Sequence, residues 1–324
     1  MPPTDTPTAT PTDSPTATDT STPTDTPTSA AVGTWAPVTS MITARYSLAG
    51  AAGPDGRVYA IGGDASSSYL LTTVEVYSPA AGSWATAAPM LTGRDDPAAA
   101  LGSDGRIYAF GGSTSSGATN IVEAYSPTTN SWISVPSMPT RRYKLAAASD
   151  TAPNGMIYAI GGNTGGGATN VFEGYSTSTQ SWTSKRSMPT ARYALAAAVG
   201  SDGRVYAIGG VDGNGTVVST VEAYDPVADT WTPVTSLPTA RYGLVAVEGV
   251  DGRIYAIGGH TTTGATNVVE AYTPSTNTWT TVASMPTSRF ELGAAVGSDN
   301  RIYAFGGTSD GRTPMGTVEA YTPP

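Results

Sequence analysis

A nine-residue stretch that recurs six times constrains this chain more than any other feature. Its clearest copy reads Asp-Gly-Arg-Ile-Tyr-Ala-Ile-Gly-Gly over residues 251–259. The copies end in glycine pairs at 62–63, 111–112, 161–162, 209–210, 258–259 and 306–307, so successive pairs are 49, 50, 48, 49 and 48 residues apart. A fixed period of this length is typical of repeat architectures. We therefore expect six similar structural units in series.

One full unit, from Met188 to Leu237, predicts four short strands. The small apolar run 192–199 suits a first strand that is buried on both faces. Asp202-Gly203 then predicts a hairpin with a type I′ turn. The second strand is expected at 204–208, the third at 220–224 and the fourth at 230–232. Four short strands joined by tight turns make an antiparallel meander.

The two ends of the chain decide how the six units are arranged. Each internal tryptophan follows the tyrosine of a third strand by seven residues, but Tyr321 stands only three residues before the end, and Trp35 has no strands before it. The missing last strand and the orphan first strand are complementary. Pairing residues 33–38 with 317–321 would remove an exposed edge. We therefore predict an all-β fold, a six-bladed β-propeller with four-stranded antiparallel blades, closed by an N-terminal outer strand.

The unit also resembles a known family. A glycine pair after an apolar strand, then a Glu-x-Tyr-x-Pro segment, then tryptophan, resembles the kelch repeat, and the resemblance covers residues 31–324. It implies a β-propeller that, in most members, binds proteins or sugars. The copper galactose-oxidase branch needs a cysteine-crosslinked tyrosine and histidine ligands. A chain with no cysteine and one histidine lies outside that branch.

Residues 1–30 form a separate segment rich in Pro and Thr, with no large apolar side chain after Met1. Such a segment cannot offset its ordering entropy by burial, which predicts a disordered spacer. Its composition is also typical of O-glycosylated stalks, which favours an extracellular or cell-surface location. No signal peptide is visible, and no apolar run is long enough to span a membrane. The candidate glycosylation sites are Thr6, Thr8, Thr10, Thr12, Thr16 and Thr18.

Two charged positions recur in every unit. One set precedes the first strand and consists of Arg45, Arg94, Arg142, Arg192, Arg241 and Arg289. The other lies in the third strand and consists of Glu75, Glu123, Glu173, Glu222, Glu270 and Glu319. Both sets are expected at one level of the blade, where they could meet across the glycine pair. Either they form structural ion pairs that fix register, or the arginines form a collar that grips an acidic ligand, as matching arginines do in some peptide-binding kelch proteins.

Two further features could carry chemistry. His260, the only histidine, directly follows a glycine pair and could form an acid/base pair with Glu248 or Glu291, although a lone histidine is more often structural. Asp95 and Asp96 stand where the other units have an aromatic residue after the arginine. Paired carboxylates can raise one another's pKa or bind a hard cation, but one isolated pair is weak evidence. We predict no metal and no cofactor.

Composition and repetition together bound the function. The formal net charge of -9 leaves no field to attract nucleic acid. Six nearly identical blades lack the asymmetric set of groups that a catalyst needs. We therefore predict a non-enzymatic structural or adhesive binding module, with a protein or glycan ligand on the loop face. One alternative is a filament, formed when the strand around Trp35 completes a neighbour's blade. Another is a carbohydrate-binding or sugar-modifying protein that resembles the kelch-type sialic acid epimerases.

Overall fold

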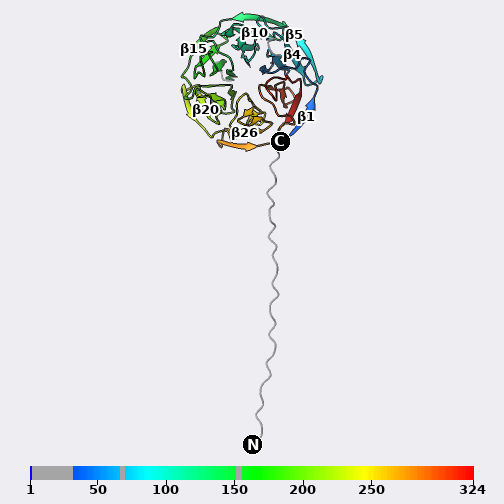
Figure 1. The fold of residues 1–324 in the computed structure, drawn as a ribbon, viewed down its shortest axis with the longest axis vertical. Helices are drawn as coiled ribbons and strands as arrows, with labels where there is room; N and C mark the ends of the chain where they lie inside the picture. Colours follow the sequence, from blue (N-terminus) through cyan, green and yellow to red (C-terminus); the bar gives the residue numbers. More distant parts are fainter. Residues whose placement is uncertain (2–31, 66–69, 151–154) are drawn as a thin grey trace. The chain divides into compact units, whose positions relative to one another are not determined.

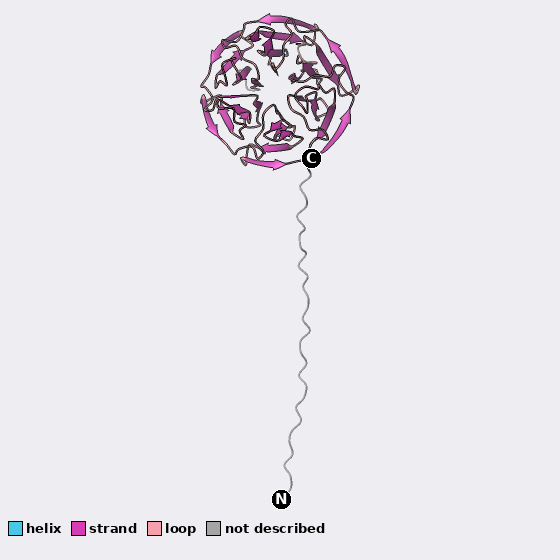
Figure 2. Ribbon diagram, in the orientation of Figure 1, coloured by secondary structure: helices cyan, strands magenta, loops and turns pink. Residues whose placement is uncertain are grey.

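The computed structural model describes Met1 and residues 32–65, 70–150 and 155–324. The chain divides into two units, Met1–Ala31 and Val32–Pro324, and the second is described below. Its described residues form strands and no helix, and six four-stranded antiparallel sheets surround a central axis (Figure 1). Figure 2 shows the outermost strands running around the circumference while the other strands of each sheet lie inside them. The predicted six-bladed β-propeller is confirmed.

The blades follow one another in chain order. Blade 1 contains β2 (Ala49–Ala52), β3 (Val58–Ile61), β4 (Val74–Ser78) and β5 (Ser83–Ala87). Blade 2 contains β6 (Ala98–Leu101), β7 (Ile107–Phe110), β10 (Val122–Ser126) and β11 (Ser131–Val135). Blade 3 contains β12 (Ala146–Ser149), β13 (Met156–Ile160), β14 (Phe172–Ser176) and β15 (Ser181–Ser184).

The second half of the ring repeats this order. Blade 4 contains β17 (Ala196–Val199), β18 (Val205–Ile208), β20 (Val221–Asp225) and β21 (Thr230–Pro233). Blade 5 contains β22 (Val245–Glu248), β23 (Ile254–Ile257), β26 (Val269–Thr273) and β27 (Thr278–Thr281). Blade 6 contains β28 (Gly293–Val296), β29 (Ile302–Phe305), β30 (Val318–Thr322) and β1 (Thr34–Val38). Three short ladders lie beside them, formed by β8 (Ser113–Thr114) with β9 (Gly117–Ala118), β16 (Arg192–Tyr193) with β19 (Val211–Asp212), and β24 (His260–Thr261) with β25 (Gly264–Ala265).

The ring is closed by the chain's own first strand. β1 pairs antiparallel with β30, and Trp35 lies opposite Tyr321 in the register. The two rings pack with their centroids 5.1 Å apart, and Trp35 Nε1 donates a hydrogen bond of 2.8 Å to the carbonyl of Ala283. The closure predicted from the chain ends is therefore confirmed. Because β1 already pairs within its own blade, donation of this strand to a neighbouring molecule is not the arrangement of this structure.

The main core lies between blades, and the second strand of each blade is its most buried element. In β18, as in the equivalent strand of every blade, the Tyr206 position and its apolar neighbours are fully buried. The first strand behaves differently from the prediction. Ala194 has a φ of 51°, which interrupts the expected strand 192–199 and leaves β16 and β17, and Ala197 is partly exposed. The prediction of one strand buried on both faces was wrong because β17 lines the central channel.

The hairpin after β17 also differs from its predicted form. A type I′ turn needs positive φ at both central residues, but only Gly203 has one, 76°, and Asp202 does not. The backbone nitrogen of Gly200 donates to the carbonyl of Arg204, which makes a three-residue loop ending in a left-handed glycine. The carboxylate of Asp202 accepts bonds from Arg204 Nε at 2.7 Å and from the hydroxyl of Tyr206 at 2.7 Å. The carboxylate of Asp202 thus holds the side chains of Arg204 and Tyr206 at the start of the second strand.

Candidate functional site

Buried ion pairs tie each blade together at one end. All six repeated arginines have no exposed surface, and each guanidinium lies 2.6–3.4 Å from the glutamate of its own blade. In blade 4, Arg192 Nη2 donates to Glu222 Oε2 at 2.8 Å. Its Nη1 also donates to the carbonyls of Gly209 and Thr220 at 2.7 and 2.9 Å. One arginine therefore connects the end of the second strand with the third strand. The pairs are Arg45–Glu75, Arg94–Glu123, Arg142–Glu173, Arg192–Glu222, Arg241–Glu270 and Arg289–Glu319.

The glycine pairs let the next blade approach. Gly209 and Gly210 both have positive φ, which favours residues without a Cβ. A Cβ on Gly209 would also stand only 2.6 Å from the carbonyl oxygen of Arg241 in the next blade. That carbonyl accepts a hydrogen bond of 2.9 Å from the nitrogen of Gly210. Each arginine thus holds its own blade through its side chain and the preceding blade through its backbone.

This burial bears on the predicted arginine collar. Burial lowers the pKa of Arg45, Arg142 and Arg289 to about 10, and the paired glutamates oppose that shift. A guanidinium with no exposed surface, paired with a buried glutamate of its own blade, cannot contact a ligand at the mouth. The interpretation of the six arginines as a ligand-gripping collar was therefore wrong, and their geometry is that of internal ion pairs.

A ring of backbone hydrogen bonds lies at the channel mouth. It is formed by the residue two positions after each arginine, and we call these six residues the rim ring: Ser47, Asp96, Lys144, Ala194, Gly243 and Glu291. All six have positive φ, between 48° and 60°. The backbone nitrogen of each donates to the carbonyl of its counterpart in the preceding blade, at 2.7–3.1 Å, so the six bonds close a circle. The rim ring is where the otherwise uniform blades differ in side chain.

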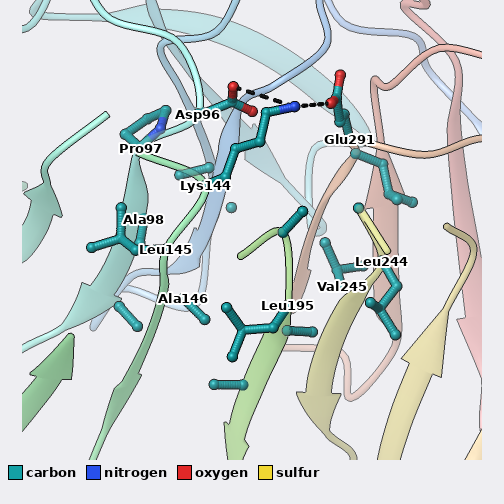
Figure 3. A pocket seen from close by; sticks show the side chains of 18 of the residues that line it. Asp96, Pro97, Ala98, Lys144, Leu145, Ala146, Leu195, Leu244, Val245 and Glu291 are labelled. Carbon is teal, nitrogen blue, oxygen red and sulfur yellow. Dashed lines mark hydrogen bonds and ion pairs between the residues drawn. The ribbon is translucent and has the colours of Figure 1, made fainter. Parts of the chain in front are cut away.

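An ion cluster crosses the mouth. Lys144 Nζ lies 2.6 Å from Glu291 Oε1 and 3.7 Å from Asp96 Oδ2 (Figure 3). Ser47 Oγ completes the cluster by donating to Glu291 Oε2 at 3.0 Å. The inner strands follow one another around the axis as β2, β6, β12, β17, β22 and β28, so blade 3 and blade 6 stand opposite each other. Lys144 of blade 3 therefore reaches across the axis to Glu291 of blade 6, a contact that we call the Lys144 bridge.

Burial makes this cluster sensitive to pH. The low polarity around Asp96 raises the pKa of its carboxyl to about 7; Lys144 opposes the shift, and the charges of Glu291 and Asp95 add to it. Burial also raises the pKa of Asp95. Burial opposes the charge of Lys144, but Asp96 and Glu291 together raise the pKa of the lysine. We therefore expect the carboxyl of Asp96 to change its protonation near neutral pH.

The surface around the mouth has two unlike halves. The residues that directly follow the six buried arginines are Tyr46, Asp95, Tyr143, Tyr193, Tyr242 and Phe290. The four tyrosines of this set are partly exposed. Blades 3, 4 and 5 contribute tyrosines to one half. Blades 6, 1 and 2 contribute the carboxylates Glu291, Asp64, Asp95 and Asp96 to the other half. Burial, followed by the charges of Asp64 and Glu291, raises the pKa of Tyr46, which lies within the acidic half.

His260 lies on this face without a carboxylate partner. Its ring packs against Tyr242 at 5.1 Å and, edge-on, against Phe290 at 4.8 Å. Within the part of the chain that the structure describes, no hydrogen bond or ion pair joins His260 to Glu291 or Glu248. Glu248 ends β22 at the opposite end of the channel. The predicted acid/base pairing of His260 with either glutamate was therefore wrong, since aromatic packing occupies the ring.

One set of predicted sites is left untested, and the sequence analysis missed one functional group. Within residues 32–65, 70–150 and 155–324, no cluster of three His, Cys, Asp or Glu side chains could hold a metal ion. The candidate glycosylation sites Thr6, Thr8, Thr10, Thr12, Thr16 and Thr18 lie outside the described residues. Sequence reasoning did not single out Lys144 or Ser47. The available signal was that the position two residues after each arginine differs in every blade.

Comparison with known proteins agrees with this architecture. The family model described as the KLHDC2/KLHL20/DRC7 Kelch-repeats domain matches residues 49–236 and 151–322, which together span most of the chain. This chain belongs to the kelch-repeat family. The kelch propeller is also similar to the solved structure of YjhT, with a TM-score of 0.72 and 18% sequence identity over 88% of this chain and 95% of that chain. At this identity the likeness concerns the fold. No curated protein matches the kelch chain.

Residues 32–65, 70–150 and 155–324 of the kelch chain contain no helix that is long and apolar enough to cross a membrane.

Proposed function

We propose that this kelch propeller is a non-enzymatic binding module whose ligand sits over the rim ring. The observation that supports this most strongly is the position of the sequence differences. The buried arginine–glutamate pairs are the same in every blade, whereas the rim ring carries Ser, Asp, Lys, Ala, Gly and Glu. A cavity of about 150 Å³ opens at this ring. Concave sites with a few convergent polar groups on a mostly apolar wall are the usual ligand sites of proteins.

The two halves of the mouth indicate the chemistry of the ligand. Four carboxylates in blades 6, 1 and 2 outnumber the one lysine of the cluster, so the acidic half favours a cationic group. The tyrosines of blades 3, 4 and 5 offer flat amphipathic rings that bind apolar side chains and also attract cations. A protein segment that presents a basic side chain next to an apolar one matches both halves. We propose such a segment as the ligand.

Binding to displayed peptides tests this proposal. Random peptides selected on the intact protein should be enriched in a basic residue beside an aromatic or aliphatic one. Tyr193→Ser and Glu291→Gln should each weaken the selected peptides by about tenfold or more, the scale of one good interface contact. Asp225→Asn removes a charge from a turn in blade 4 and serves as the matched control. Acidic or neutral consensus peptides, or peptides whose binding ignores both mouth variants, would overturn the proposal.

A carbohydrate is the second candidate ligand, because partly exposed tyrosines beside polar groups suit a sugar ring. Tyr46 Oη, for example, lies 3.4 Å from Asp64 Oδ2. Binding of the intact protein to an array of neutral and acidic glycans separates the two candidates. Retention of one glycan class that is lost in Tyr46→Ser and Tyr193→Ser would favour the carbohydrate over the peptide.

We also propose that the module acts at or outside the cell surface, in adhesion or as a structural element, with residues 1–30 as its stalk. The Pro/Thr composition of that segment supports this. The intact mass of the native protein provides the test. Mass increments of hexose or hexosamine on residues 1–30 would support the stalk, whereas an unmodified mass would count against it. Sedimentation at high concentration would report any filament.

A further inference from the structure

The end of the axial channel opposite the Lys144 bridge is lined mostly by apolar side chains. The inner strands of all six blades contribute to this lining. At this end the wall consists of Ala52, Leu101, Ser149, Val199, Glu248 and Val296, which line a cavity of about 280 Å³. The hydroxyl of Ser149 is already used, since it donates to the carbonyl of Leu101. Glu248 is thus the one charged side chain in the described wall of this cavity.

Glu248 has no cation beside it. The hairpins beside Glu248 carry a different set of arginines. Each of them pairs with an aspartate of its own turn, as in Arg204–Asp202 and Arg253–Asp251, both at 2.7 Å. Among the described residues no ion pair and no hydrogen bond involves the Glu248 side chain. Burial raises the pKa of Glu248, and the charges of Asp202 and Asp251 raise it further. A partly buried carboxylate in a negative field gains most from a positive partner.

The rest of the channel limits what that partner can be. Further along the axis the channel is lined by residues with small side chains or none. Gly50, Ala99, Ala147, Ala246 and Ala294 line both cavities. Beyond them the Lys144 bridge crosses the far mouth. An occupant that enters at Glu248 therefore meets methyl and methylene groups, which favour a slender apolar chain.

We propose that this end of the channel binds a linear primary alkylammonium ion, with its ammonium on Glu248 and its alkyl chain along the alanine-lined axis. The site is separate from the mouth surface of the proposed function, because it opens at the other end of the channel. An alkyl carboxylate would be repelled by Glu248. An alkanol of the same length would fill the same space but leave the carboxylate without a counter-charge.

Calorimetric titration of the intact protein with n-alkylamines tests this site. From butylammonium to hexylammonium the affinity should rise by about fourfold per added methylene, the usual gain on burying one such group. Hexanol and hexanoate should bind about fivefold more weakly than hexylammonium, which is the upper end of the scale for one partly exposed ion pair. Glu248→Gln keeps the volume of the side chain and should lose the preference for the amine over the alcohol.

The controls make each outcome decisive. Asp225→Asn changes the net charge by the same amount as Glu248→Gln, but at an exposed turn, and should leave amine affinity within about twofold, near the resolution of such comparisons. Ala246→Leu narrows the channel while keeping Glu248, and should weaken hexylammonium more than butylammonium. No amine binding to the wild-type protein would overturn the proposal. So would equal binding of hexanol and hexylammonium, or unchanged amine binding in Glu248→Gln.

Discussion

Glu222→Gln tests whether the buried ion pairs hold the blades together. The substitution keeps the shape of the side chain but leaves Arg192, which has no exposed surface, without its counter-charge. Glu222 also accepts a bond of 2.9 Å from the hydroxyl of Thr190. Removing one partner of a buried pair costs about 3–5 kcal/mol, because a desolvated charge is left behind. At about 2–4 °C per kcal/mol for a body of this size, the melting temperature should fall by roughly 10 °C.

Urea unfolding followed by fluorescence provides the assay, since six tryptophans lie in the propeller. Arg204→Ala is the matched control, because the Arg204–Asp202 pair has the same chemistry but side chains that are 31% and 29% exposed. Exposed pairs contribute at most about 1 kcal/mol. A loss of free energy in Glu222→Gln no larger than in Arg204→Ala would refute the reasoning.

A double variant separates charge from hydrogen bonding. Arg192→Met combined with Glu222→Met removes both charges, so the uncompensated-charge penalty disappears. The carbonyls of Gly209, Thr220 and Ala207 nevertheless lose the donors that Arg192 supplied, although Thr220 keeps a bond of 3.0 Å from the nitrogen of Gly209. A buried acceptor that is left unsatisfied costs about 1–3 kcal/mol. We therefore expect the double variant to recover part of the stability lost in Glu222→Gln, and to remain less stable than the wild-type protein.

Three further predictions concern the closure and the mouth. Trp35→Ala should lower the free energy of unfolding by about 2–3 kcal/mol, measured in urea, because it removes the ring packed on Tyr321 and the bond to Ala283. Because burial raises the pKa of Asp96 from 3.8 to about 7, the unfolded chain loses this proton first as pH rises. Stability should therefore fall between about pH 4 and pH 7, and urea titrations over this range should show no such fall in Asp96→Asn. Lys144→Met removes the cation that opposes the shift and should move the Asp96 titration to higher pH, as followed by carboxyl NMR.

The propeller could be predicted because its signals are local and repeated. The period of the glycine pairs and the seven-residue step from tyrosine to tryptophan recur in each blade. The partnership of Trp35 with Tyr321 followed from counting strands, which needs no knowledge of side-chain geometry. Completing the last blade with the strand around Trp35 covers the edge of β30, so the main alternative was donation of the same strand to a neighbouring molecule.

The mouth could not be predicted in the same way, because its chemistry depends on contacts between distant blades. Lys144 and Glu291 are 147 residues apart, and their contact requires that blades 3 and 6 face each other across a narrow axis. Ala194 has a left-handed backbone, but because it is not a glycine the sequence did not indicate a break there. The first strand was therefore expected to be continuous. The burial of the arginines was also ambiguous, since a repeated arginine can serve a ligand or a glutamate. The structure decides between these two roles because it shows the arginine side chains buried against the glutamates.

The circle of peptide groups in the rim ring separates how the blades meet from what the opening recognises. The six hydrogen bonds that close this circle between neighbouring blades are made by main-chain atoms, so serine, aspartate, lysine, alanine, glycine and glutamate all occupy equivalent places. Branched residues such as valine or isoleucine are disfavoured there by the left-handed backbone. A kelch scaffold built this way can acquire a new specificity by single exchanges at six interchangeable sites without remodelling its architecture.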